Sequence, residues 1–307
     1  MKKGYFSTFV LCILLVFCFQ YKESIVNFIM NKVDQNVITL PLENNFNNNI
    51  DFQFVQKTDE FHVKNYQNLL NVIYTVLNNG TSEFTFYCDD SYSECMNDFT
   101  KLTADQVLLS TINNLVSPYN SYEKIYFKST TYGKITMSLD KLYSEEEINL
   151  SEKKINDFMA NNINDDMDVV EKIKVFHDFL INNSVYDKAR ANLIENGGET
   201  GKSRSHKSIG PLVDGIALCS GYSDAMKIFL DKIGVTSYKI SNENHIWNLV
   251  YVNDQWLHLD LTWDDPVTNT GENVLLYKFF LIDTDTLHNL DSTGHNYNST
   301  YYPEVSY

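Results

Sequence analysis

Cys219 lies in the segment of this sequence whose composition most restricts its chemistry. Glycines stand on both sides, at Gly215 and Gly221, and an apolar helical pattern that includes Phe229 and Ile233 begins directly after it. A cysteine in the first turn of a helix lies next to free N–H groups and the positive end of the helix dipole, which favour the thiolate and can hold an oxyanion. The segment therefore predicts a nucleophile, although buried cysteines at helix starts are often inert.

Two strand-like runs downstream carry the imidazole and the carboxylate that a cysteine nucleophile needs. Residues 244–252 and 255–262 are joined by Asn253-Asp254, a pair suited to a two-residue hairpin turn. Such a turn fixes the register and makes His245 and Asp260 diagonal neighbours on one face of the hairpin. Their Cα atoms would lie roughly 7–8 Å apart, a distance that the two side chains can span.

The same register predicts Trp247 opposite Asp260 and His245 opposite Thr262. A three-residue loop would shift the pairing by one position and put His245 and Asp260 on opposite faces. In the predicted arrangement the imidazole of His245 takes the thiol proton and later returns one to the leaving group. The carboxylate of Asp260 holds the imidazole in the correct tautomer.

Other titratable residues offer alternatives. His258 is a competing base on the same face, but it is expected to face the interior of the hairpin, whereas His245 stands at the open end. Asp260 could also be a solvated carboxylate at a strand end. His177 lies on an apolar helical stripe, where a histidine usually packs. Asp264-Asp265 could take calcium, but no ligand spacing links this pair to the histidines, so no metal and no other cofactor is predicted.

Composition and charge restrict the class of protein. The chain has 307 residues, 43% hydrophobic and 14% aromatic, which is enough for one large or two ordinary folded domains. Its 24 basic and 40 acidic residues give a net charge of -16, which would repel a phosphate backbone. Nucleic acid is therefore not an expected partner.

The first residues indicate export. Lys2 and Lys3 precede an apolar run over residues 5–19, which is about 15 residues long and shorter than the roughly 20 that a membrane span needs. No small-x-small cleavage site follows, so residues 1–23 are expected to be a signal peptide or a membrane anchor. Both alternatives place the body of the protein outside the cytoplasm, either secreted or anchored to the membrane.

The remaining cysteines fit the same compartment. Cys12 and Cys18 lie within the apolar run, where they behave as small hydrophobes. Cys88 and Cys95 are seven positions apart and could form a short-loop disulfide or remain two unpaired thiols. Cys219 has no evident partner, which marks it as a candidate reactive thiol.

Three regions are expected after the apolar segment. Residues 24–60 are Asn-rich and are predicted to be a linker with one strand-like stretch at 37–42. Residues 61–145 are predicted to be a small α+β domain. Its expected elements are a helix over 63–77 ended by Asn79-Gly80, a strand over 83–87, a helix capped by Thr103 with Val107, Leu108, Ile112 and Leu115 facing inward, and strands over 124–130 and 134–139 turned at Tyr132-Gly133.

Residues 146–307 are predicted to form the domain that carries the chemistry. Apolar stripes around 155–159 and 170–180 indicate two helices. The segment over 196–207 is rich in Gly, Ser and charge, and is expected to be a mobile loop just before Cys219.

Three motifs follow one another in the C-terminal half. They are Gly215-x-x-x-Cys219-x-Gly221-Tyr222-Ser223-x-Ala225, His245-x-Trp247-Asn248 and His258-x-Asp260-x-Thr262-Trp263-Asp264-Asp265-Pro266. Their spacing resembles that of the bacterial transglutaminase-like superfamily. The resemblance covers roughly residues 165–290, with a lead-in from Lys172 to Tyr186-Asp187 and a closing strand from Tyr277 to Ile282. It implies a papain-like α+β core, with the cysteine helix packed on an antiparallel sheet, and a Cys219, His245 and Asp260 triad.

The resemblance also implies a reaction. An exported cysteine-dependent enzyme of this kind attacks an amide or peptide carbonyl and forms a thioester. Water then gives a protease or amidase, and a lysine-type amine gives a crosslinking transferase; the far higher concentration of water slightly favours hydrolysis. The expected substrate is a protein or peptide, with the cell envelope as one candidate source. The alternative is a non-catalytic cell-surface module that keeps the fold to bind a partner.

Overall fold

The computed structural model describes residues 20–22, 24–25, 38–40, 46–50, 52–198, 203–266 and 274–302. The predicted signal peptide or anchor lies outside these residues apart from a few positions at its end. No helix in the described part of the chain is long and apolar enough to cross a membrane. Of the strand-like stretch at 37–42, residues 38–40 have no regular structure and the rest lies outside the described residues.

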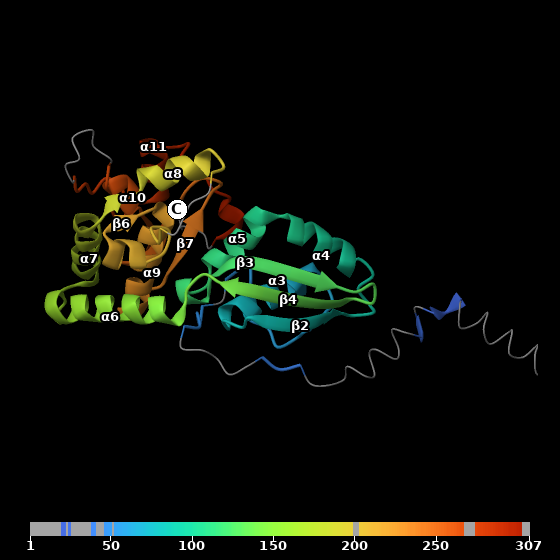
Figure 1. Cartoon of the computed structure of the whole chain (residues 1–307). Helices are drawn as coiled ribbons and strands as arrows, with labels where there is room; N and C mark the ends of the chain where they lie inside the picture. Colours follow the sequence, from blue (N-terminus) through green and yellow to red (C-terminus); the bar gives the residue numbers. More distant parts are fainter. Residues whose placement is uncertain are drawn as a thin grey trace, which may run out of the picture.

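The N-terminal half contains a four-stranded sheet with helices against its buried face (Figure 1). The strand order is β1-β2-β4-β3, in which β1 pairs parallel to β2 and the other pairs are antiparallel. The elements in chain order are β1 (His62–Val63), α3 (Tyr66–Asn78), β2 (Glu83–Cys88), α4 (Cys95–Ala104), α5 (Gln106–Asn114), η1 (Pro118–Asn120), β3 (Tyr122–Ser129) and β4 (Lys134–Lys141).

Several of these elements follow the predicted signals. Helix α3 ends at the expected Asn79-Gly80, where Gly80 adopts a φ of 65° that favours glycine. The β3–β4 hairpin turns at Gly133, which has a φ of 77°. In β4 alternate residues are buried, because Ile135, Met137 and Leu139 face the helices.

The prediction for the second helix was wrong at its cap. The side chain of Asp105 caps α5 by accepting the Leu108 N–H at 2.9 Å. Thr103 instead lies in the last turn of α4, a helix that was not predicted, and donates its hydroxyl to the Thr100 carbonyl. The start of α5 is two residues later than expected, and Val107 is 50% exposed rather than facing inward.

Cys88 and Cys95 form a disulfide. Cys88 ends β2 and Cys95 begins α4, which brings their Cα atoms to 5.9 Å. The alternative of two unpaired thiols is therefore excluded, and Cys219 is the free cysteine of the described residues.

The C-terminal half is also a mixture of helices and sheet, so the chain has an α+β fold. Its three-stranded antiparallel sheet has the order β7-β8-β9, and α9 packs against β7 and β8. The elements are α6 (Glu145–Asn162), α7 (Val169–Asn183), β5 (Val185–Tyr186), α8 (Lys188–Glu195), η2 (Gly210–Asp214), β6 (Ile216–Ala217), α9 (Cys219–Lys232), β7 (Ser237–Ser241), β8 (Ile246–Val252), β9 (Gln255–Leu259), α10 (Leu261–Asp264), α11 (Thr284–Leu290) and η3 (Ser299–Tyr301).

The β8–β9 hairpin has the predicted register over a shorter length. Asn253 and Asp254 have φ values of 53° and 61°, as a two-residue turn of type I′ requires. The ladder pairs Val252 with Gln255 and stops where Asn248 pairs with Leu259. The predicted pairs of Trp247 with Asp260 and of His245 with Thr262 therefore do not form. The chain leaves the strand because the Asp260 side chain caps α10.

One further expectation for this half was wrong, because the closing strand expected over 277–282 is a single bridge between Ile282 and His258. Of the mobile loop expected over 196–207, residues 199–202 lie outside the described residues. The described end of this loop is anchored, because Ser205 is fully buried and its carbonyl accepts the Leu218 N–H at 2.7 Å. Strand β7 was not predicted at all.

One hydrophobic core extends across the boundary predicted near residue 145. It contains Phe86 and Ile112 from the N-terminal half together with Tyr238 and Ile240 from β7. Phe52, which falls in the predicted linker, packs edge-on against Tyr238 with ring centroids 5.5 Å apart. The domain boundaries themselves remain a prediction.

Candidate functional site

The site begins with the N-terminal turn of α9. Cys219 is its first residue, and the preceding Leu218 is extended, with φ and ψ of -101° and 173°. The Leu218 carbonyl accepts its hydrogen bond from the Tyr222 N–H, at 3.1 Å. The N–H of Cys219 therefore has no acceptor within the helix and is available to a negative charge near the partly buried thiol.

A tightly packed backbone segment holds this helix start in place. A Cβ added at Gly221 would collide with the Ser205 carbonyl oxygen, so only glycine allows the two backbones to approach. The Ser205 carbonyl also accepts the Leu218 N–H. Gly221 in the sequence motif thus has a steric reason in the fold.

Buried polar contacts fix α9 against the sheet. Asp224 forms an ion pair of 2.7 Å with Lys239 on β7 and accepts the Tyr143 hydroxyl at 2.7 Å. The Asn248 amide on β8 donates to the Ser223 carbonyl at 2.9 Å. These contacts set the position of the Cys219 helix relative to β7, which precedes His245, and β8, which follows it.

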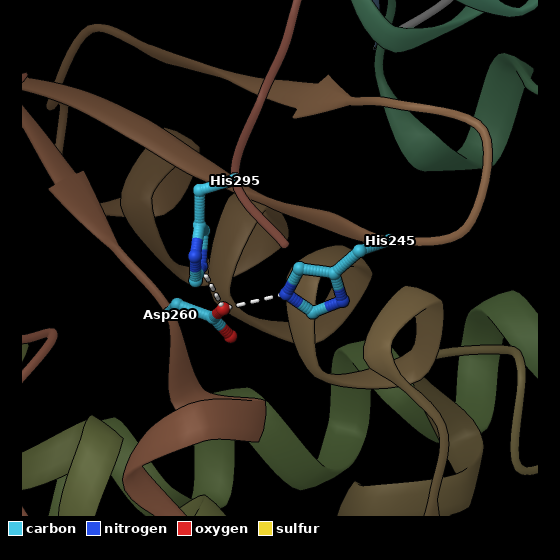
Figure 2. Close-up of side chains that lie close together, drawn as sticks. All are labelled: His245, Asp260 and His295. Atoms are coloured by element: carbon cyan, nitrogen blue, oxygen red, sulfur yellow. Dashed lines mark hydrogen bonds and ion pairs between the residues drawn. The ribbon is translucent and has the colours of Figure 1, made fainter. Parts of the chain in front are cut away.

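His245 and Asp260 meet as the sequence predicts. The His245 Nε2 lies 2.5 Å from the Asp260 Oδ2 (Figure 2). Burial alone would raise the pKa of Asp260, but the charges and hydrogen bonds of His245 and His295 lower it below its usual value. An ionised carboxylate only accepts, so Nε2 carries the proton and Nδ1 is left for the thiol. The ring is stacked on Trp247 with centroids 5.5 Å apart.

Cys219 also interacts with the imidazole of His245. Burial lowers the pKa of His245, but Asp260 and the neighbouring sulfur of Cys219 outweigh it and raise the pKa to about 10. The structure therefore brings all three predicted residues into one cluster.

Tyr186 also lies beside Cys219. The parallel pairing of β5 with β6 aligns Tyr186 with Ala217, two positions before the cysteine. Burial and the negative charges around it, Cys219 first among them, raise the pKa of Tyr186 to about 12. In the sequence, Tyr186 is marked only as part of the lead-in Tyr186-Asp187.

His295 is a member of the site that the sequence does not indicate. It is fully buried, and its Nε2 lies 2.8 Å from the Asp260 Oδ2, the oxygen that His245 also contacts (Figure 2). Its Nδ1 lies 3.0 Å from the Asp291 Oδ2. His295 follows Gly294 in a segment without helix or strand, so no periodic pattern marks it.

His258 is excluded as the competing base. It is fully buried, its Nδ1 accepts the Trp247 indole N–H at 3.0 Å and its Nε2 lies 3.1 Å from the Thr284 hydroxyl. Burial and the neighbouring His295 lower the pKa of His258 to about 3. It pairs with Leu249 inside the hairpin, as expected.

The other titratable candidates serve the packing. His177 is fully buried with its Nε2 3.3 Å from Asp264, which confirms a packing role. The second oxygen of Asp264 accepts the Phe279 N–H at 3.0 Å, and Asp265 accepts the Tyr222 hydroxyl at 2.7 Å. The carboxylates considered for calcium thus have protein donors.

His245, Asp260 and His295 have the atom types of a transition-metal site, within 4.8 Å of one another. Their N–O distances of 2.5 and 2.8 Å are those of direct hydrogen bonds. Two atoms that each lie about 2.0 Å from a tetrahedral zinc ion are about 3.3 Å apart. The cluster as it stands therefore fits shared protons better than an ion.

A cleft of about 750 Å³ opens at His245. Its walls come from the loop between β7 and β8, from Trp263, from several residues between Thr293 and Tyr302, and from Val107 and Thr111 of α5. Among the described residues that line it, Glu243 is the acidic one and none is lysine or arginine.

Comparisons with known proteins give little beyond this geometry. No family model and no curated protein matches the sequence. A solved structure described as a crystal structure of a TGase is similar over 46% of this chain and 44% of that chain, with 16% identity and a TM-score of 0.33. The match thus spans less than half of that chain.

Proposed function

We propose that the protein is a cysteine-dependent acyl-transfer enzyme of the transglutaminase-like kind, with Cys219 as nucleophile, His245 as base and Asp260 as the residue that orients His245. The observation that carries the proposal is the position of His245. Its Nε2 is held at 2.5 Å by a buried carboxylate while its ring interacts with the sulfur of Cys219. This is the relation that nucleophilic catalysis by a thiol requires.

The proposed reaction has two stages. The Cys219 sulfur, after giving its proton to His245, attacks an amide carbonyl, and the oxyanion is held by the Cys219 N–H. His245 then protonates the departing amine as the C–N bond breaks, which leaves a thioester. Water or a primary amine attacks the thioester, gives its proton to His245 and displaces the sulfur.

The cleft at His245 supports a peptide substrate. Its neutral hydrogen-bonding side chains, such as Asn242 and Asn244, and the partly exposed ring of Trp263 suit a polypeptide better than a phosphate group. Glu243 and the net charge of -16 disfavour an anionic substrate. We therefore include a neutral or basic peptide segment in the proposal, with the cell envelope as one source.

The proposed location is outside the cytoplasm, either secreted or anchored by the N-terminal segment. The disulfide between Cys88 and Cys95 supports this part, because such bonds persist mainly in oxidising compartments.

A product assay tests the function and separates its two forms. The protein is incubated with a glutamine-containing peptide and a labelled primary amine, with Cys219→Ala and His245→Gln as controls. A labelled amide that depends on both residues means a transferase, and a free acid means a hydrolase. Turnover that persists in Cys219→Ala would contradict the proposal, and a general absence of product over a panel of peptides would favour the binding module.

A further inference from the structure

Asp260 joins two imidazoles, and the second one is itself joined to another carboxylate. From the thiol outward the groups are Cys219, His245, Asp260, His295 and Asp291. The distance from His245 to Asp260 is 2.5 Å, that from Asp260 to His295 is 2.8 Å, and that from His295 to Asp291 is 3.0 Å. The first three residues account for the proposed chemistry, so His295 and Asp291 need an explanation of their own.

The carboxylates decide which way the hydrogen bonds of His295 point. Burial alone would raise the pKa of Asp291, but the Gly294 N–H, the His295 ring and the Thr293 side chain and N–H lower it. The pKa of Asp260 is lowered as well. Each ring nitrogen of His295 therefore lies within hydrogen-bond distance of a carboxylate oxygen, and an ionised carboxylate can only accept a hydrogen bond.

The ring of His295 is held firmly. It is fully buried and stacked on Phe279 with centroids 5.2 Å apart and an angle of 17° between the planes. The Trp263 ring packs against it edge-on at 4.7 Å. Asp291, its outer partner, accepts the Thr293 hydroxyl at 3.0 Å at the end of α11. A ring packed this closely can hold a carboxylate in one orientation.

We propose that His295, anchored by Asp291, is a positioning residue that holds the Asp260 carboxylate against His245 and adds a positive charge next to it. This inference rests on the proposed function, because its effect is exerted through the Cys219–His245 pair. His295 does not reach the reacting atoms itself. It contacts Asp260 on the Oδ2 that His245 also uses, so it limits how far that carboxylate can turn.

The charge of His295 has a consequence for His245. The charged and titratable groups around His245 are Asp260, Cys219 and His295, and those around His295 are Asp260, Asp291, His245 and His258. A cation beside Asp260 offsets part of the charge that stabilises the His245 imidazolium. Loss of that cation should let His245 keep its proton to higher pH.

The pH profile of Cys219 alkylation by iodoacetate measures this effect without a substrate. Iodoacetate is an anion and reacts fastest while His245 is protonated, so the alkaline limb of the profile reports the loss of that proton. In Asp291→Asn, His295 keeps its donation to Asp260 and loses its charge, and the limb is expected to move up by about 0.5–1 pH unit. In His295→Gln we expect the alkaline limb to move in the same direction and the alkylation rate of Cys219 to fall about 10-fold or more. His288→Gln is the matched control, because His288 is exposed on the neighbouring α11.

The outcomes separate the inference from the proposed function. If the wild-type protein reacts no faster than His245→Gln, the proposed function fails. A second outcome is that wild-type Cys219 is alkylated faster than in His245→Gln, but the alkaline limb of the pH profile lies at the same pH in the wild type, Asp291→Asn and His295→Gln. His295 is then only a packing residue, and the inference is overturned. If the His295 variant does not fold, the NMR chemical shifts of the ring nitrogens in histidine-labelled wild-type protein still test the inference. They must show N–H at both ring nitrogens of His295 at neutral pH, and a single protonated nitrogen would overturn the inference.

Discussion

A carboxylate taken out of water needs donors for its oxygens, and Asp260 obtains them from several directions. Its Oδ1 accepts the Thr262 N–H at 2.9 Å and the more distant Trp263 N–H, and its Oδ2 is shared by His245 and His295. The same side chain that caps α10 therefore orients His245. This dual use explains why the aspartate stands directly after a strand and before a helical turn.

The pKa of His245 predicts how stability depends on pH. The value is raised from 6.5 to about 10, so the folded state binds the proton more tightly than the unfolded chain. The stabilisation is fully present below pH 6.5 and is lost as pH rises through about 10. Thermal or urea unfolding should show the wild type to be more stable than His245→Gln by about 2 kcal/mol at pH 6, and by much less at pH 10.

His288→Gln again serves as the control for this comparison, because it removes an exposed histidine of α11 and leaves the contact between His245 and Asp260 in place. If the difference in the free energy of unfolding between the wild type and His245→Gln is as large at pH 10 as at pH 6, Asp260 does not hold the His245 proton in the way described.

At the scale of elements, the approach of α9 to the 203–209 segment depends on one missing side chain. Gly221→Ala places a Cβ on the Ser205 carbonyl oxygen, which belongs to the backbone and cannot rotate away. We expect a loss of about 1–3 kcal/mol in the free energy of unfolding, as for other overpacked cores. Because the helix start would move, the alkylation rate of Cys219 should fall on the order of 100-fold.

Ser220→Ala is the matched variant, since it changes the adjacent helical position without adding a Cβ. Chemical denaturation and alkylation kinetics of the two variants give the comparison. Wild-type stability and reactivity in Gly221→Ala would mean that the loop yields easily and does not position the helix.

The elements also show what the sequence could and could not predict. The hairpin register was predictable because Asn253-Asp254 tolerates positive φ at both positions and because alternation fixes the faces. The end of β9 was not, since Asp260 is compatible with a strand and leaves it only because its side chain caps α10. The sequence alone does not distinguish Asp105 from Thr103 as the cap of α5, because both residue types cap helices and the choice depends on α4 ending between them.

His295 shows the limit of sequence reasoning for the site. It is 35 positions from Asp260 and reaches it from a segment with no regular structure. Only the tertiary packing of this segment over Trp263 and Phe279 brings it there. Cys219, His245 and Asp260, by contrast, lie directly at the ends of predictable periodic elements: Cys219 begins α9, His245 precedes β8 and Asp260 follows β9.

At the scale of the whole molecule, the two halves share one hydrophobic core. Tyr238 and Ile240 on β7 are fully buried in the core that the N-terminal helices and sheet form. Asn114, at the end of α5, donates to the Ser241 hydroxyl at 2.6 Å. Residues of α5 form part of the wall of the cleft at His245. The N-terminal half thus supports the sheet that carries His245.

This shared core predicts that residues 146–307 do not fold alone. Removing the N-terminal half would expose Tyr238 and Ile240, which together contribute on the order of 3–6 kcal/mol by burial. That is a large part of the roughly 5–15 kcal/mol by which a typical protein is stable. Circular dichroism should show no cooperative unfolding of the 146–307 fragment, and its Cys219 should react with iodoacetate no faster than a free thiol. A fragment over 46–307, which keeps the shared core, should unfold in one transition with full alkylation rate. A cooperatively folded 146–307 fragment with rapid alkylation would instead show that the half carrying Cys219, His245 and Asp260 is an autonomous domain, and that the N-terminal half only completes the cleft.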